Sequence, residues 1–126
     1  MRIVLSYQSD LPIYEQIKEQ IKADIISGEL AENEPLPSIR RLARELEVSV
    51  ITTTRAYSDL ELEGFINTVP GKGCYVKKLD VNFIRQQYLN LTKSTLKTAI
   101  QQSKTAGLTI EDVHNLIDEM DNDHDS

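Results

Sequence analysis

The sequence predicts a mainly α-helical protein with one small β-hairpin: an N-terminal winged helix-turn-helix over residues 1–78 and a two-helix segment over residues 79–126. Three observations lead to this fold class. Two short amphipathic patterns flank a tight turn within residues 38–57. A Pro-Gly-Lys-Gly turn then separates two strand-forming pairs. After residue 78, two further helical patterns are separated by Gly107.

A first helix is expected between Asp10-Leu11-Pro12 and Gly28. Aspartate can cap a helix, proline is tolerated in the first turn, and glycine favours a left-handed helix end. The apolar stripe of this helix consists of Ile13, Tyr14, Ile17, Ile21 and Ile25. The charged side chains expected to face water are Glu15, Lys18, Glu19 and Lys22. The preceding Ile3-Val4-Leu5 predicts either an edge strand or an ordered arm.

Residues 38–57 predict a helix-turn-helix with its turn at Glu47-Val48-Ser49. Ser38 and Ser49 can each accept hydrogen bonds from the free amides of the helix that follows. The residues predicted to be buried are Ile39, Leu42, Ala43 and Leu46 in the first helix and Thr53, Ala56, Tyr57 and Leu60 in the second. The opposite face of the second helix carries Ile51, Thr52, Thr54, Arg55 and Ser58. Such a helix can enter a DNA major groove.

The next stretch, FINTVPGKGCYV at residues 65–76, predicts a β-hairpin, which directly after a recognition helix forms a wing. Its turn, Pro70-Gly71-Lys72-Gly73, places a lysine between two glycines. The backbone there can approach a phosphate or a minor groove closely. Cys74 is interpreted as a small side chain within the hairpin, and a redox role is the alternative.

The two-helix segment starts at Asp80 or Asn82, and its first helix is expected to reach Ala106. An approximate capping box begins the second helix, and the acidic residues after Met120 are predicted to be disordered. Two such helices cannot enclose a core, so their apolar surface must pack on the first domain or on a second copy. We favour a homodimer, because a winged helix usually reads two half-sites through a two-fold axis. A monomer in which both helices brace the winged helix is the alternative.

The net charge of −6, taken alone, argues against a nucleic-acid partner. Its distribution points the other way, because residues 35–58 hold four arginines against two glutamates and residues 64–78 hold three lysines and no acid. We therefore expect a cationic surface on an acidic protein; charges that only solvate helix faces are the alternative. One cysteine, no leader and no apolar run long enough to cross a bilayer predict a cytoplasmic protein without a membrane partner.

The sequence contains no nucleophile–base motif, phosphate-binding loop or Cys/His cluster, so we expect neither enzyme activity nor a cofactor. His114 and His124 lie near several aspartates in the acidic C-terminal stretch. Their spacing fits no compact ligand set, and no metal site is predicted.

Several motifs occur together within residues 11–78, in the order PIYEQIKEQI, GEL, LPSIRRLA, TTTRAYSDLELEGFI and PGKGCYV. They resemble the GntR family of bacterial transcription regulators. The RAY in the recognition helix and the short two-helix tail are similar to the YtrA subfamily. The resemblance implies a dimeric winged-helix repressor, often of transporter genes, without a large effector-binding domain.

The same resemblance implies which positions contact DNA. These positions are Arg40, Ser49, Val50, Ile51, Thr52, Thr54, Gly71 and Lys72. Val50 and Ile51 depart from the family pattern, in which Arg or Pro and then Thr or Asn are usual. Fewer hydrogen-bonding groups then face the bases, and contact with thymine methyl groups would suit both side chains.

Three arginines share the first helix of the helix-turn-helix and cannot all face DNA. We place Arg40 on DNA, leave Arg41 open between DNA and an ion pair with a nearby glutamate, and expect Arg44 to be solvated. Arg55 in the recognition helix either contacts a phosphate, which we favour, or pairs with Asp59.

Three hypotheses follow. The leading one is a sequence-specific transcription regulator, a repressor that binds a palindromic double-stranded DNA operator as a homodimer. The second is a protein-interaction module that kept a winged helix without DNA binding. The third is a ligand-gated regulator, whose small-molecule effector would need the crevice between the long helix and the winged helix.

Overall fold

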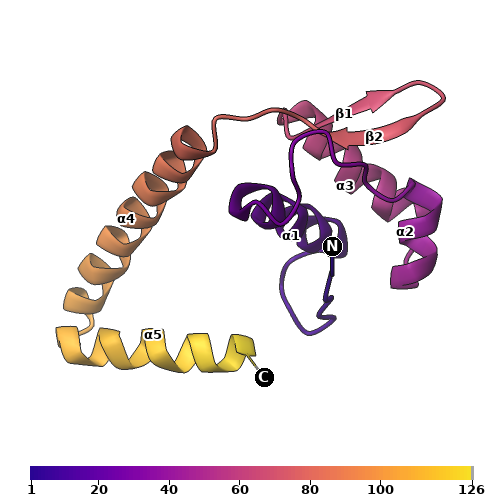
Figure 1. Cartoon of the computed structure of the whole chain (residues 1–126). Helices are drawn as coiled ribbons and strands as arrows, with labels where there is room; N and C mark the ends of the chain where they lie inside the picture. The colour runs from indigo at the N-terminus through magenta and orange to yellow at the C-terminus, as the bar shows by residue number, and fades with distance from the viewer. Residues whose placement is uncertain (126) are drawn as a thin grey trace. The chain divides into compact units, whose positions relative to one another are not determined.

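The computed structural model describes the backbone of residues 1–125 and the side chains as far as residue 122. Its elements are α1 (Ile13–Ser27), α2 (Ile39–Leu46), α3 (Val50–Leu62), β1 (Ile66–Val69), β2 (Gly73–Val76), α4 (Val81–Thr105) and α5 (Ile110–Asp125) (Figure 1). They form two compact units, and the chain passes from the first to the second after Val81. The predicted fold class, mainly helical with one hairpin, is confirmed.

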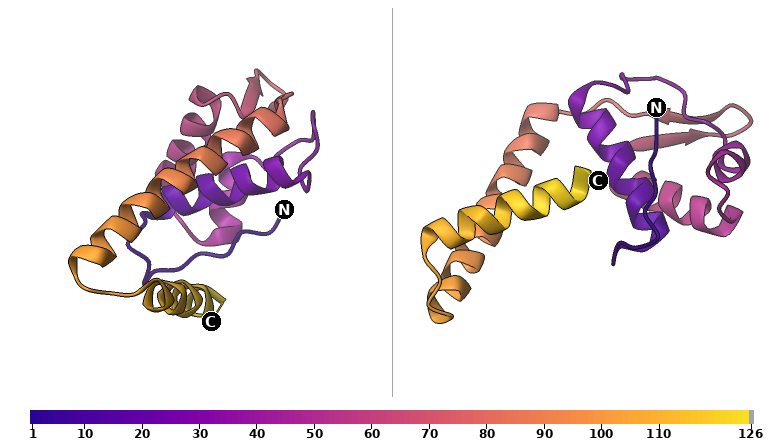
Figure 2. Two further views of the ribbon diagram at one scale, coloured as in Figure 1. Left: turned by 90° about the vertical axis from the view of Figure 1, so that its left-hand side faces the viewer. Right: turned by 90° about the horizontal axis from the view of Figure 1, so that it is seen from below.

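Helix α3 lies at the centre of the first unit, where it packs against α1, α2 and β1 (Figures 1 and 2). Its inner face is the predicted one, with Thr53, Ala56, Tyr57 and Leu60 buried. The apolar side chains that complete this core include Ile17, Ile21, Ile25, Leu42, Ala43, Phe65, Ile66 and Val76. The Tyr57 hydroxyl donates to the carbonyl oxygen of Pro37 at 2.7 Å, which ties the recognition helix to the connection before α2. Burial raises the pKa of Tyr57, so the phenol stays a neutral donor.

The predicted helix ends are confirmed except at the start of α1. Ser38 Oγ accepts from the Arg41 amide and Ser49 Oγ accepts from the Thr52 amide, so both serines are N-caps. Gly28 ends α1 in the left-handed region, with φ of 90°. The predicted cap at the start of α1 is wrong: Pro12 holds the N-cap position without a side-chain hydrogen bond. Because the helix begins after the proline, the aspartate at position 10 lies too far upstream to reach its first amides.

The N-terminal residues form an ordered arm rather than a strand. The carboxamide of Gln20 accepts from the amide of Val4 at 2.9 Å and donates to its carbonyl oxygen at 2.7 Å. Gln16, which is buried, makes the same two hydrogen bonds with Ser6 and a third to the carbonyl oxygen of Leu11. Two glutamine side chains thus make the hydrogen bonds to the backbone of the arm that a neighbouring strand would make, and they hold the arm against α1.

The sequence predicted that Lys18 and Lys22 face water, and this prediction is wrong. Lys22 is buried, with its ammonium 2.6 Å from one carboxylate oxygen of Glu63 and 5.2 Å from the centroid of the Phe65 ring. The Lys18 ammonium lies 3.3 Å from the other Glu63 oxygen. Helical spacing places both lysines beside the buried stripe, where their alkyl stems are covered while their ammonium groups reach the end of α3. Glu63 therefore joins α1 to α3.

The charges of this cluster shift the pKa values of its members. Burial by itself would raise the pKa of Glu63, but hydrogen bonds and attraction from Lys22 and Lys18 outweigh burial and hold that pKa below its usual range. Burial by itself would lower the pKa of Lys18, but the hydrogen bond and attraction from Glu63 outweigh burial, so the pKa of Lys18 is raised.

We expect the stabilisation from Glu63 to be lost on acidification. Its pKa is lower in the folded protein than the ordinary 4.5, so its contribution is complete above about pH 4.5 and disappears as the pH falls through the folded pKa. In urea denaturation from about pH 7 to about pH 3, the wild type should lose more free energy of unfolding than Glu63→Gln. Glu32→Gln, in the exposed connection before α2, is the matched control and should behave as wild type.

The hairpin confirms the predicted wing. Its strands are antiparallel, with Ile66 opposite Val76 and Val69 opposite Gly73. The connection before α2 adds a short third pairing to β2: the Leu36 amide donates to the Cys74 carbonyl, and the Val76 amide donates to the Glu34 carbonyl. The wing is therefore anchored to the segment that leads into the helix-turn-helix.

The second unit consists of α4 and α5. Thr109 and Asp112 make reciprocal side-chain-to-amide hydrogen bonds at 3.1 and 2.8 Å, which confirms the predicted capping box. No residue of α4 is buried, and Val113 is the buried apolar residue of α5 within the described side chains. Helix α5 continues to Asp125, although the sequence predicted disorder after Met120, because adding a residue to an existing helix is far easier than starting one. Within the described part of the chain, no helix is both long and apolar enough to span a bilayer.

Candidate nucleic-acid interface

All ten predicted site residues lie in the first unit, on α2, at the start of α3 or at the hairpin tip. Figure 1 shows these three elements on the same side of that unit, at the right of the view. The exposed face of α3 is the predicted one: Thr54, Arg55 and Ser58 are exposed and Thr52 is half-buried. Two apolar side chains stand at its beginning, with Val50 45% exposed and Ile51 82% exposed.

Ser49 and Thr52 are bonded to each other at the first turn of α3. Ser49 Oγ accepts from the Thr52 amide at 3.0 Å and donates to Thr52 Oγ1 at 2.8 Å. The Thr52 hydroxyl proton is left for an acceptor outside the helix. These two side chains therefore fix the start of the helix, and Thr52 can still donate to a phosphate or a base.

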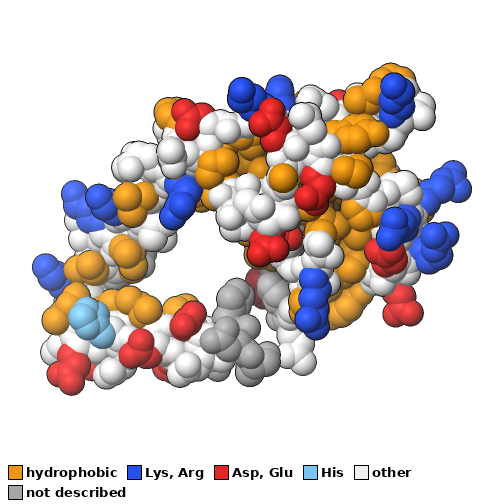
Figure 3. Space-filling model, in the orientation of Figure 1, with side chains coloured by type: hydrophobic (Ala, Val, Ile, Leu, Met, Phe, Trp, Pro, Cys, Tyr) orange, Lys and Arg blue, Asp and Glu red, His pale blue; other side chains and the backbone are white. Residues whose placement is uncertain are grey.

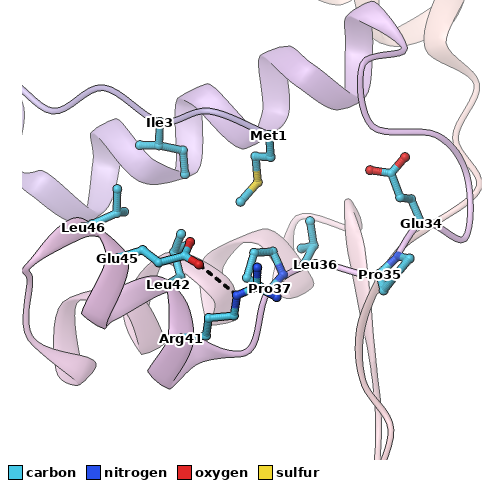
Figure 4. Close-up of a pocket in the computed structure, with 10 residues that line it drawn as sticks. All are labelled: Met1, Ile3, Glu34, Pro35, Leu36, Pro37, Arg41, Leu42, Glu45 and Leu46. Atoms are coloured by element: carbon cyan, nitrogen blue, oxygen red, sulfur yellow. Dashed lines mark hydrogen bonds and ion pairs between the residues drawn. The ribbon is translucent and has the colours of Figure 1, made fainter.

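Helix α2 presents cationic side chains beside the turn. Arg40 is exposed and makes no ion pair within the described chain. Arg41 Nε lies 2.8 Å from Glu45 Oε1, so Arg41 forms the predicted ion pair in the free protein (Figure 4). A DNA contact by Arg41 stays a prediction. Arg44 is exposed, as predicted. In Figure 3, Lys and Arg side chains gather over this helix.

Arg55 does not pair with Asp59, and its predicted contact with a DNA phosphate stays a prediction. Its guanidinium carbon lies 3.8 Å from the centroid of the Tyr14 ring, a cation–π contact between α3 and α1. Asp59, the alternative partner considered from the sequence, lies 4.0 Å from the Lys18 ammonium. Sequence reasoning assigned Tyr14 to the buried stripe, although it is half-buried and offers its ring to Arg55. The contact fixes the stem of Arg55 and leaves the residue exposed.

The hairpin tip is held in one conformation while its side chains remain accessible. Gly71 and Lys72 are exposed, and Gly71 has φ of 77°, which a side chain would disfavour. The Lys72 amide donates to the Val69 carbonyl at 2.9 Å, and the Tyr75 hydroxyl donates to the Lys72 carbonyl at 3.1 Å. The tip therefore presents a lysine on a fixed backbone.

A pocket of about 370 Å³ lies between the N-terminal arm and α2 (Figure 4). Met1 and Ile3 line it from the arm, and the Arg41–Glu45 ion pair lines it from α2. The pocket lies wholly within the first unit. A small-molecule effector in the crevice beside the long helix stays a prediction. No cluster of potential metal ligands occurs among the described residues, and the side chain of His124 lies outside them.

The sequence model described as "Bacterial regulatory proteins, gntR family" matches residues 13–76, from the first residue of α1 to the last of β2. The chain belongs to the GntR family. The members of this family regulate transcription and are not enzymes.

One named relative and two solved structures show how much of the chain is matched, from 60% to 98%. The HTH-type transcriptional repressor YtrA of Bacillus subtilis (strain 168) is 33% identical over 121 residues, which span 96% of this chain and 93% of YtrA. A crystal structure described as a transcriptional antiterminator from Listeria monocytogenes EGD-e has a TM-score of 0.70 at 35% identity, covering 98% of this chain and 92% of its own. The DNA-binding domain of AraR in complex with operator ORR3 has a TM-score of 0.51 at 30% identity, covering 60% of this chain and 92% of its own.

Proposed function

We propose that this protein is a homodimeric repressor that binds a palindromic DNA operator of a transporter-type operon. Residues 1–78 would bind DNA and residues 79–126 would form the dimer. The observation that carries the proposal is the exposed start of α3, flanked by the unpaired Arg40 and by Lys72 at the fixed hairpin tip. The relative AraR, whose DNA-binding domain shares this fold, was crystallised with operator DNA, which supports the proposal.

The division of labour rests on how the two units bury their side chains. The first unit has its own core, and its basic groups lie around the helix-turn-helix. The second unit leaves large apolar side chains exposed on both of its helices. Apolar surface of this extent marks an interaction site. A second copy is the partner that would also supply the second half-site contact.

Titration of DNA from the protein's own operon at two salt concentrations tests the proposal. Lysine and arginine contacts to phosphates release counterions, so the affinity should fall steeply as salt rises. A scrambled duplex of equal length is the control, and it should bind more weakly at both concentrations. Binding that is absent, or that does not respond to salt, would instead favour a protein-interaction module, for which the exposed apolar Ile51 would be the contact.

We expect Ile51 to contact a thymine methyl group in the operator. Its side chain is 82% exposed in the free protein, and thymine offers the apolar group of the major groove. Replacing single thymines by deoxyuridine removes the methyl alone and should weaken binding at the contacted position by roughly fourfold, or about 0.8 kcal/mol.

The variant Ile51→Ala supplies the matching half of a double-mutant cycle. It should bind more weakly to the thymine operator and should no longer distinguish thymine from deoxyuridine at the contacted position. Equal sensitivity of wild type and variant at every thymine would contradict the contact.

A further inference from the structure

The second unit separates its charges by helix. The charged residues of α4 are Arg85, Lys93, Lys97 and Lys104, with no aspartate or glutamate among them. Helix α5 contains no lysine or arginine, and its acidic residues are Glu111, Asp112, Asp118, Glu119, Asp121, Asp123 and Asp125. In Figure 3, Lys and Arg side chains accordingly follow α4 and Asp and Glu side chains follow α5. Opposite charge on two helices favours contact between them.

Helix α4 carries a shallow groove with an apolar floor and a cationic edge. Leu96 and Ile100 form the floor, and Lys93, Lys97 and Lys104 line the groove. Leu96 is 42% exposed although it lies in the middle of the helix. The alkyl stems of the lysines extend the apolar floor of the groove, and their ammonium groups can bind anionic side chains.

Helix α5 has the complementary surface. Leu116, Ile117 and Met120 share one face at helical spacing and are 46%, 46% and 71% exposed. Glu119 and Asp121 border this face on its two sides. The helix therefore offers an apolar edge between two rows of carboxylates.

The groove is not covered by α5 of the same chain. The two helices meet at the turn around Gly107 and diverge from it in Figures 1 and 2. No residue of α4 is buried. Near the turn, Val113 on the same face of α5 is buried. Further along α5, Leu116, Ile117 and Met120 stay exposed. This part of the α5 surface is therefore open to the α4 groove of a second copy.

We propose that, in the homodimer, α5 of each copy lies in the α4 groove of the other copy. The inference rests on the homodimer proposed above. Two-fold symmetry makes the two α4–α5 contacts identical, so one complementary pair of surfaces is used twice. Leu116, Ile117 and Met120 would cover Leu96 and Ile100, and the carboxylates would lie beside the three lysines. The charges fix the orientation of the helices and keep two α4 helices from pairing with each other.

Charge reversal on one helix at a time tests this arrangement. The α4 variant is Lys93→Glu, Lys97→Glu and Lys104→Glu; the α5 variant is Asp118→Lys, Glu119→Lys and Asp121→Lys. Asp112 is kept because it caps α5. Each variant alone should raise the dissociation constant of the dimer at least tenfold, by light scattering and native mass spectrometry. A one-to-one mixture of the two should form a heterodimer at the wild-type concentration, because each acidic helix then meets a basic one.

The mixture of the two variants distinguishes α4–α5 pairing between two chains from α4–α5 pairing within one chain. If the charges paired within one chain, the mixture would stay monomeric and only a chain carrying both sets of substitutions would recover, which would overturn the proposal. The proposal would also be overturned if either variant alone remained dimeric. An α4 variant that bound DNA more weakly but still dimerised would be such a result. Lys72→Glu, Lys77→Glu and Lys78→Glu make the same charge change in the first unit and should leave the dimer intact.

Two further measurements keep the test decisive. Helical content by circular dichroism shows whether each variant folds. For the unmodified protein, the dissociation constant of the dimer should rise with added sodium chloride, because ion pairs at the interface are screened. A constant that does not change or that falls would overturn the proposal without any variant. A wild type that is monomeric at every concentration would overturn the homodimer itself, whereas DNA titration tests operator binding separately.

Discussion

Arg40→Ala is expected to weaken operator binding by about 1–3 kcal/mol if the guanidinium contacts a base, roughly 5- to 150-fold in the dissociation constant. The side chain is exposed in the first turn of α2 and has no ion partner among the described residues, so it has no such ion pair to give up on binding DNA. Fluorescence anisotropy with DNA from the protein's own operon measures the loss. Because folding does not depend on this side chain, circular dichroism of the variant should match that of the wild type.

Arg44→Ala is the matched control, because it removes the same charge from the last turn of the same short helix. It should weaken binding much less, since only the long-range attraction to phosphates is reduced. Lys72→Ala offers a second comparison: it should weaken binding evenly across sequences and reduce the salt slope by about one. Wild-type affinity of Arg40→Ala, or equal losses for Arg40→Ala and Arg44→Ala, would place the DNA on another face of α2.

Sequence patterns predicted most of the core and most of the helix ends, because these depend on local spacing and local hydrogen bonds. Tyr14, Ile39 and Leu46, predicted to be buried, are half-buried. The serine N-caps, the glycine end of α1 and the capping box of α5 each involve residues within one turn of one another. The wrong assignments depend on which element packs beside a helix. Lys22 satisfies the pattern of a solvent-facing position, but it is buried where Glu63, 41 residues further along the chain, pairs with its ammonium group.

The candidate site shows the same division. Periodicity was sufficient to predict that Ile51 and Thr54 are exposed, since α3 buries its opposite face. Arg41 and Glu45 are four residues apart on one helix, so the sequence could suggest their ion pair as the alternative to a DNA contact of Arg41. The contact between Arg55 and Tyr14 could not be foreseen, because it joins two helices whose crossing depends on the whole core. Many sequences place an arginine on the exposed face of one helix and an aromatic residue on another helix, so this pattern does not indicate a cation–π contact.

Leu60→Ala is expected to lower the free energy of unfolding of the first unit by about 2–5 kcal/mol, the largest effect of any substitution considered for this chain. Leu60 is fully buried on the inner face of α3, where that helix packs against α1 and β1. Removing three carbon atoms loses their transfer free energy and leaves a cavity that the surrounding helices fill only in part. Urea denaturation followed by circular dichroism measures the change. The protein concentration is held fixed, because the proposed dimerisation would contribute to stability.

Leu62→Ala tests whether the effect comes from burial rather than from the residue type. Leu62 lies two residues further along α3 and is 86% exposed, so its replacement should change the free energy of unfolding by less than about 0.5 kcal/mol. The two variants also separate stability from recognition. At low temperature, where Leu60→Ala remains folded, its operator affinity should stay near the wild-type value, because Leu60 lies on the buried face of α3, opposite the face proposed to bind DNA. Similar destabilisation by both variants would mean that α3 presents a different face to the core, and the exposed face assigned to DNA would then be wrong as well.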